Sequence, residues 1–166
     1  MIKIGVINYG MGNLLSVTNV LNYYKISYDL INYSDKSFDQ TYDGYILPGV
    51  GSFKNAMDII NQSGLSEYIL REVKLKNKPI LGICLGMQLL FSSSTEGGGA
   101  NGIELIEGTI ERFDSPVFKI PHVGWNQIAI LKKNLLMADN NNDFYFDHSF
   151  YLKTHVDNII GSSEYI

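Results

Sequence analysis

In the first half of the chain, short apolar runs alternate with segments whose apolar residues recur every three or four positions. The short runs predict strands near residues 3–8, 28–33, 44–47 and 80–83. The other segments predict helices at about residues 14–24, 52–62, 65–75 and 85–91. Because strands that alternate with helices form βαβ units, we expect an α/β fold with an open, mostly parallel sheet flanked by helices.

The second half of the chain has a different pattern. Strand-like runs at about residues 109–113, 126–131 and 144–152 follow one another without helices between them. These runs predict antiparallel additions to the sheet. Since the chain shows no internal repeat and no linker-like segment, we expect residues 1–166 to form a single domain.

Composition and charge exclude several classes of function. Of the 166 residues, 45% are hydrophobic and 18% charged, and the net charge is −4, which is typical of a globular protein. The 13 lysines and arginines are scattered, so no nucleic-acid partner is expected. No apolar run reaches the roughly 18 residues of a membrane-spanning helix, and no signal peptide is visible, so we expect a cytoplasmic protein. One cysteine and three widely spaced histidines give no metal-ligand set, and no cofactor is expected.

The strongest chemical signal surrounds the single cysteine, in the run Gly82-Ile83-Cys84-Leu85-Gly86-Met87-Gln88. The run joins a predicted strand to a predicted helix, as a nucleophile elbow does, and the small residues around the nucleophile let the two elements approach closely. The thiol of Cys84 would lie at the positive end of the helix, which favours a thiolate. The backbone N–H of Leu85 would face a developing oxyanion. The alternative is a buried cysteine that packs as a small hydrophobic residue.

A second signal is the run Pro48-Gly49-Val50-Gly51, which comes directly after another predicted strand. Its two glycines free the backbone to turn N–H groups toward a bound carbonyl oxygen. Since ligands of parallel sheets bind at the carboxyl ends of the strands, this run is expected near Cys84. It is a natural source of a second oxyanion donor, although a plain turn between strand and helix has the same pattern.

The elbow resembles that of the class I (triad) glutamine amidotransferases, which have a flavodoxin-like fold. Within that class, Tyr9-Gly10-Met11-Gly12-Asn13, the 48–51 run and Pro121-His122-Val123-Gly124-Trp125-Asn126 narrow the resemblance. Together they resemble the family of glutaminase subunits of imidazole glycerol phosphate synthase, an enzyme of histidine biosynthesis. The resemblance extends from Ile4 to about Tyr165.

The resemblance implies a role for each matching residue. Cys84 would attack the carboxamide of glutamine, giving a glutamyl thioester and ammonia. The backbone of Val50, Gly51 and Leu85 would form the oxyanion hole. Glu96 would suit the α-ammonium group of the substrate. The full set of residues that match glutamine-binding positions is Gly49, Gln88, Glu96, His148 and Ser149.

The resemblance also implies a partner, a (β/α)₈-barrel cyclase subunit that would form a heterodimer with this chain and receive the ammonia. In the family, the strand that carries the oxyanion donors is thought to reorient when the partner binds, so the oxyanion hole is expected to be incomplete in the free subunit. The residues at matching interface positions are Asn13, Pro121, His122, Trp125 and Asn126.

The sequence departs from the family in its acid–base residues. The family supplies a general base and an orienting carboxylate from a His-Pro-Glu segment near the C-terminus, and these 166 residues contain no such segment. The resemblance therefore implies that the single amidotransferase domain expected at residues 1–166 lacks its last strands. His122 and His148 match other positions, and His155 lies in a predicted loop. Smaller departures are Asn8 and Leu15, which flank the first loop. Since removing one member of a triad slows catalysis by orders of magnitude, we expect the activity of this stretch of chain to be low.

Three functions therefore remain open. The first is a glutaminase subunit for imidazole glycerol phosphate synthesis, or a paralogue that serves another acceptor, and it predicts faster glutamine hydrolysis with the partner. The second is a peptidase or amidase with a cysteine elbow, which predicts activity without a partner. The third is a non-catalytic binding or scaffold protein, which predicts a thiol that alkylates slowly.

Overall fold

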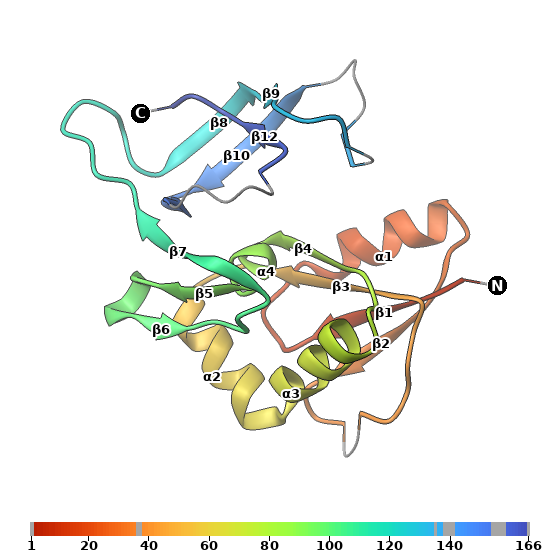
Figure 1. Cartoon of the computed structure of the whole chain (residues 1–166). Helices are drawn as coiled ribbons and strands as arrows, with labels where there is room; N and C mark the ends of the chain where they lie inside the picture. The colour runs from red at the N-terminus through yellow and green to blue at the C-terminus, as the bar shows by residue number, and fades with distance from the viewer. Residues whose placement is uncertain (1, 36–37, 135, 138–141, 154–158, 166) are drawn as a thin grey trace. The chain divides into compact units, whose positions relative to one another are not determined.

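The computed structural model describes residues 2–35, 38–134, 136–137, 142–153 and 159–165. They fall into two compact units, Met1–Thr109 and Ile110–Ile166, and each unit is described by itself (Figure 1). Within the described ranges, no helix combines the length and the apolar character needed to cross a membrane.

A parallel sheet forms the centre of the first unit. Its four strands lie in the order β2-β1-β3-β4, and each neighbouring pair is parallel. The predicted parallel α/β sheet is confirmed, with strand bounds within two residues of those expected. The strands are β1 (Lys3–Asn8), β2 (Ser27–Asn32), β3 (Gly44–Gly49) and β4 (Ile80–Cys84).

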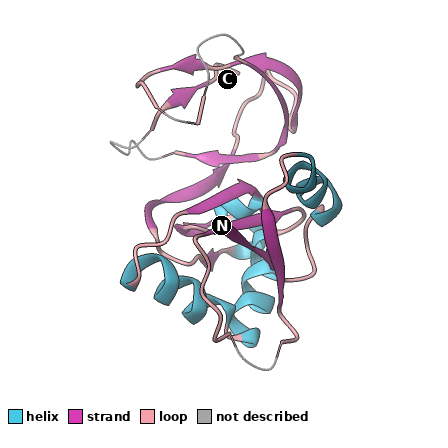
Figure 2. Ribbon diagram, turned by 90° about the vertical axis from the view of Figure 1, so that its right-hand side faces the viewer, coloured by secondary structure: helices cyan, strands magenta, loops and turns pink. Residues whose placement is uncertain are grey.

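Helices cover both faces of this sheet, with α1 on one side and α2 and α3 on the other (Figure 1, Figure 2). The side chains of Asn13 and Ser52 accept hydrogen bonds from backbone N–H groups of the first turns of α1 and α2, which otherwise have no partner inside the helix. α3 continues into a π-helical turn, η1 (Arg71–Leu75), and together they form the helix predicted at 65–75. The helices are α1 (Leu14–Tyr23), α2 (Phe53–Ser63) and α3 (Leu65–Leu70).

The main core lies between the sheet and the helices α2 and α3. Both helices place apolar side chains on the sheet at helical spacing, and these side chains are removed from water almost completely. The most buried members of this core include Ile7, Leu47, Phe53, Ile60, Leu65, Ile69 and Leu89. Ile7 of β1 and Leu47 of β3 belong to this core, so the core fixes the positions at which the loops after these two strands begin.

The helix predicted up to residue 91 is wrong at its C-terminal end. α4 spans only Leu85–Gln88, and strand β5 (Phe91–Ser94) starts three residues later. The reason is a tertiary contact: the carbonyl oxygens of Leu89 and Leu90 accept hydrogen bonds from the backbone of Ile103 and Leu105. Because these carbonyl oxygens are taken by other backbone N–H groups, the helix ends in a turn at the buried residues Leu89 and Leu90, and the chain is extended from Phe91 onward.

The remainder of the first unit continues from β5. The short strand β6 (Ala100–Asn101) pairs antiparallel with β5, and the 3₁₀ turn η2 (Glu96–Gly98) joins the two strands. β7 (Ile106–Arg112) follows and lies next to β5 in a sheet of order β11-β7-β5-β6. This arrangement brings Glu96 to the tip of a tight connection.

The second unit contains antiparallel strand pairs, which confirms the antiparallel pairing, but these strands form sheets of their own and are not additions to the parallel sheet as predicted. β8 (His122–Gln127) pairs with β10 (Asp143–His148), and β11 (Phe150–Leu152) pairs with the end of β7. β9 (Ala129–Ile130) pairs with β12 (Gly161–Ser162). The run predicted as one strand at 144–152 is divided at Ser149, where the chain leaves one pairing and enters another.

Candidate active site

The backbone makes a sharp turn at Cys84, where β4 passes into α4. Cys84 has φ 55° and ψ −118°, a conformation that residues other than glycine rarely adopt. Such local strain is typical of functional sites, where the surrounding structure maintains it. The side chain of Cys84 is exposed, so it does not pack as a core hydrophobic residue.

The glycines on either side of Cys84 allow this turn by close approach. A Cβ at Gly82 would lie 2.4 Å from the Cα of Met87, and a Cβ at Gly86 would lie 1.8 Å from the carbonyl oxygen of Leu47. Both distances are far inside van der Waals contact, and the atoms concerned belong to the backbone. The elbow therefore requires glycine at both positions.

The 49–51 segment lies beside the elbow. Gly49 pairs with Cys84 across β3 and β4, and a Cβ at Gly49 would lie 2.6 Å from the backbone nitrogen of Gly86. Val50 is half exposed, and its backbone N–H donates to the carbonyl oxygen of Met11, with 3.2 Å between nitrogen and oxygen. The N–H of Val50 is thus occupied within the protein in this structure.

Two polar side chains expected at the site lie in the same unit as Cys84. The first, Gln88, is partly buried at the end of α4. Leu85 is the first residue of the same helix, so its backbone N–H has no hydrogen-bond partner inside α4. The Oε2 atom of Glu96 accepts a hydrogen bond from the backbone N–H of Phe53 at 2.7 Å. Since Phe53 comes two residues after Gly51, this bond ties the turn η2 to the end of the 49–51 segment.

The other residues expected to bind glutamine lie in the second unit. The Nδ1 atom of His148 lies 2.9 Å from the carbonyl oxygen of Phe150. Ser149 offers its carbonyl oxygen to the backbone N–H of Phe113. This contact with the backbone fixes the orientation of the His148 ring.

The residues expected at a partner interface differ in exposure. Asn13 is exposed at the start of α1, and Trp125 is 74% exposed, with its ring edge-to-face against Tyr145. The side-chain amide of Asn126 donates to the carbonyl oxygen of Glu164. Pro121 follows a cis peptide bond just before β8.

His122 is buried inside the second unit. Its ring stacks on the rings of Tyr165 and Phe146, at centroid distances of 3.7 and 4.7 Å. Burial and the nearby His148 lower the pKa of His122, so it is neutral at pH 7. The imidazole of His122 therefore acts as a packing group within this unit.

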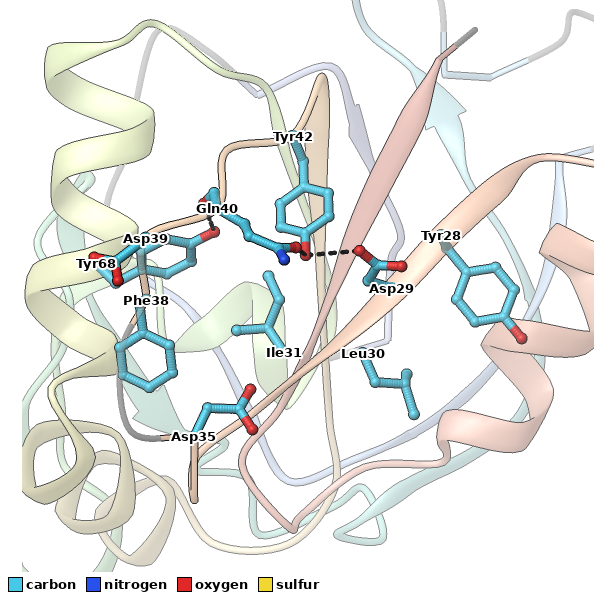
Figure 3. Close-up of a pocket in the computed structure, with 10 residues that line it drawn as sticks. All are labelled: Tyr28, Asp29, Leu30, Ile31, Asp35, Phe38, Asp39, Gln40, Tyr42 and Tyr68. Carbon is cyan, nitrogen blue, oxygen red and sulfur yellow. Dashed lines mark hydrogen bonds between the residues drawn. The ribbon is translucent and has the colours of Figure 1, made fainter.

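A cavity of about 720 Å³ lies at the opposite edge of the parallel sheet, along β2 (Figure 3). Its wall is polar and aromatic, and the hydroxyl of Tyr42 lies 3.1 Å from Asp29 and 2.7 Å from Gln40. None of the residues that line it is among those expected to bind glutamine. The described residues contain no group of three or more side chains able to hold a metal ion.

The chain matches the family model described as "Glutamine amidotransferase class-I" over residues 5–163. It belongs to this family. The resemblance drawn from the motifs is confirmed, and so is the flavodoxin-like fold of this class.

Two curated relatives refine the placement within the amidotransferases. The chain is 43% identical over 164 residues to "Imidazole glycerol phosphate synthase subunit HisH" of Halalkalibacterium halodurans, covering 95% of this chain and 75% of that protein. It is 42% identical to the protein of the same name from Moorella thermoacetica, over 98% of this chain and 77% of that one.

Solved structures agree on the fold of this amidotransferase. One, titled "Crystal structure of glutamine amidotransferase", has a TM-score of 0.70 at 13% identity and covers 95% of this chain and 78% of its own. Another, "Structure of PurLQS from Thermotoga maritima", has a TM-score of 0.66 at 18% identity and covers 98% of this chain and 75% of its own. At these identities the likeness concerns the fold alone.

In this amidotransferase, the first unit contains most of the residues expected at the site: Cys84, Gly49, Val50, Gly51, Leu85, Gln88 and Glu96. The sequence did not predict the bond from Val50 to Met11, although the two residues follow the neighbouring strands β3 and β1. All three histidines come after residue 109, so none belongs to the unit of Cys84, and His155 lies outside the described residues.

Proposed function

We propose that this chain is the glutaminase subunit of an imidazole glycerol phosphate synthase, and that it passes ammonia to a (β/α)₈-barrel cyclase subunit. The observation that carries the proposal is the strained backbone of exposed Cys84 beside the 49–51 segment. The identity of 42–43% to subunits with this name supports imidazole glycerol phosphate synthesis over the other reactions that amidotransferases serve.

The geometry supports attack by sulfur on the carboxamide carbon of glutamine. The thiolate of Cys84 forms a C–S bond while the carbonyl oxygen gains negative charge, which the N–H of Leu85 faces from the start of α4. The C–N bond then breaks, ammonia leaves with a proton from a general acid, and water hydrolyses the thioester to glutamate. The general acid–base group is not supplied by a histidine of the first unit, because that unit contains none.

The bond from Val50 to Met11 explains why the partner would matter. While the N–H of Val50 donates to Met11, it cannot donate to an oxyanion at Cys84. Met11 lies two residues before Asn13, which we propose as a contact of the partner. Binding of the cyclase subunit at this loop would therefore release the second oxyanion donor, and the free subunit would hydrolyse glutamine slowly.

Covalent labelling of Cys84 tests the proposed function. A chloroketone analogue of glutamine should alkylate the protein once, because a thiolate displaces chloride without help from a general base. We expect mass spectrometry to place the label on Cys84, the only cysteine, and glutamine but not leucine to slow the labelling. The Cys84→Ala variant is the blank. Labelling that glutamine leaves unchanged would contradict a glutamine site.

Glu96 offers a prediction that separates recognition from folding. Glu96→Gln keeps an oxygen for the N–H of Phe53 but loses the charge that would meet the α-ammonium group of glutamine. We expect the glutamine concentration that protects Cys84 by half to rise by about tenfold to a hundredfold, because hydrogen bonds to charged groups are worth ~1.5–3 kcal/mol. The melting temperature should change little.

The matched variant Glu96→Ala loses both the charge and the bond to Phe53. It should lower the melting temperature as well as weaken protection by glutamine. If Glu96→Gln were protected at the same glutamine concentration as the unmodified chain, the charge of Glu96 would have no part in binding.

A non-catalytic binding protein is the second candidate, favoured by the absence of histidine from the unit of Cys84. It predicts a thiol that the chloroketone labels no faster than a free thiol in solution. It also predicts no ammonia release from glutamine after a barrel cyclase subunit is added, whereas the glutaminase proposal predicts release that rises with the partner.

A further inference from the structure

Tyr9, the residue directly after β1, has a buried hydroxyl without a hydrogen-bond partner. The side chain is 1% exposed, and its hydroxyl oxygen is one of three buried side-chain polar atoms for which the described residues supply no partner. Burying a hydroxyl without a partner is unfavourable, so such a group calls for an explanation. The reaction described above does not use Tyr9.

The hydroxyl of Tyr9 lies against the elbow. A Cβ at Gly49 would be 2.4 Å from the hydroxyl oxygen, 2.6 Å from the backbone nitrogen of Gly86 and 2.9 Å from the Cβ of Leu85. Gly49 pairs with Cys84, and Leu85 and Gly86 are the two residues that follow Cys84. The side chain of Tyr9 thus extends from β1 past β3 and ends where the turn at Cys84 begins.

The surroundings of the Tyr9 hydroxyl keep it protonated, so it remains able to donate a hydrogen bond. Burial raises the pKa of Tyr9, and negative charge on Cys84 raises it further. The phenol therefore keeps its proton throughout the physiological range. A thiolate is a far better acceptor than a thiol, so the value of this donor depends on the ionisation of Cys84.

We propose that the hydroxyl of Tyr9 donates a hydrogen bond to the sulfur of Cys84 when the thiol has lost its proton. Cys84 is exposed, and the proposed bond requires its side chain to rotate about the Cα–Cβ bond so that the sulfur turns toward Tyr9. The bond stabilises the thiolate and holds it beside Gly49. The hydroxyl has no partner while the thiol is protonated and gains one when the nucleophile forms. A catalytic effect of this hydrogen bond rests on the proposed role of Cys84 as the nucleophile, whereas the formation of the bond does not.

Alkylation kinetics of the Tyr9→Phe variant test the proposal. The rate of Cys84 alkylation by iodoacetamide is measured from pH 5 to 10 on the full chain, with intact mass as the readout. We expect the midpoint of the rate profile to move upward by about one pH unit, the effect of losing one hydrogen bond to a charged group. The melting temperature should stay the same or rise, because the variant loses no hydrogen bond present in the structure.

Tyr68→Phe is the matched control. The hydroxyl of Tyr68 is buried too, but it donates to the carbonyl oxygen of Gln40 at 2.9 Å and lies 3.1 Å from the hydroxyl of Tyr45. This variant should lower the melting temperature and leave the alkylation profile unchanged. Tyr68→Phe thus measures how the loss of a hydroxyl with a purely structural role changes the melting temperature and the alkylation rate.

The outcomes separate the inference from the proposed function. Coincident profiles for the unmodified chain and Tyr9→Phe would overturn the inference, and so would a loss of melting temperature without a shifted profile. If the unmodified chain reacted no faster than a free thiol, the proposed nucleophile would fail. The difference between the two profiles would still measure the hydrogen bond from Tyr9.

Discussion

The Gly86→Ala variant is expected to lose the elbow at Cys84 and about 3 kcal/mol or more of its free energy of unfolding. The added Cβ would lie 1.8 Å from the carbonyl oxygen of Leu47 and 2.7 Å from its carbonyl carbon. Leu47 is fully buried in β3, which is paired on both sides, so its backbone cannot move away without breaking the sheet. We expect α4 to shift instead, and labelling of Cys84 by the chloroketone to disappear.

Urea denaturation measures the loss of stability, and Gly98→Ala is the control. Gly98 has a positive φ, of 92°, which Gly86 does not, and no atom lies within 4 Å of a Cβ built on it. Its substitution should cost only the strain of the backbone, about 1–2 kcal/mol, and leave the labelling intact. If Gly86→Ala unfolded at the same urea concentration as the unmodified chain, the close approach of α4 to β3 would be disproved.

The second large effect concerns Glu72, a fully buried carboxylate in the π-helical turn η1. Its Oε2 atom accepts hydrogen bonds from the hydroxyls of Thr41 and Tyr45, at 2.6 and 2.8 Å. Its Oε1 atom accepts from Lys76 at 2.8 Å and from Arg71 at 3.1 Å. One buried carboxylate therefore accepts hydrogen bonds from four side chains.

Glu72→Gln should lower the free energy of unfolding by about 3 kcal/mol, because it removes the charge and turns an NH₂ group toward donors. Burial by itself raises the pKa of Glu72, but the hydrogen bonds from Lys76, Thr41, Tyr45 and Arg71 outweigh it and lower the pKa to about 2, from a usual value of 4.5. The carboxylate thus stabilises the fold fully above about pH 4.5, and this stabilisation is lost as the pH falls toward 2.

Urea titrations between pH 2.5 and 7 check this prediction. The stability of the unmodified chain should fall below about pH 4.5, and that of Glu72→Gln should fall less steeply. Asp58→Asn is the control, since Asp58 forms an exposed ion pair with Lys54 at 3.2 Å and should contribute less than about 1 kcal/mol. Parallel pH curves for the unmodified chain and Glu72→Gln would contradict the role given to Glu72.

Much of the fold and part of the site could be predicted from local patterns. The periodicity of apolar residues is a local property of the chain, and it placed the four parallel strands within two residues. The run around Cys84 also carries its own geometry, because only glycine permits backbone contact at positions 82 and 86. The same residues indicate the amidotransferase family without reference to any tertiary contact.

Other features depend on residues far apart in the chain. The end of α4 was predicted wrongly because hydrogen bonds from Ile103 and Leu105 take the carbonyl oxygens of Leu89 and Leu90. The choice of Met11 as the partner of the Val50 N–H, and the position of the Tyr9 hydroxyl against Gly49, are equally invisible in a local pattern.

The sequence by itself determined the parallel sheet, the elbow and the family, since each depends on residue types at short spacings. Tertiary structure decided which backbone groups around Cys84 are occupied and which hydroxyl is left without a partner. The physical reason is that a donor takes whichever acceptor the packed strands bring near it, and packing joins β1, β3 and β4 across about 80 residues of chain.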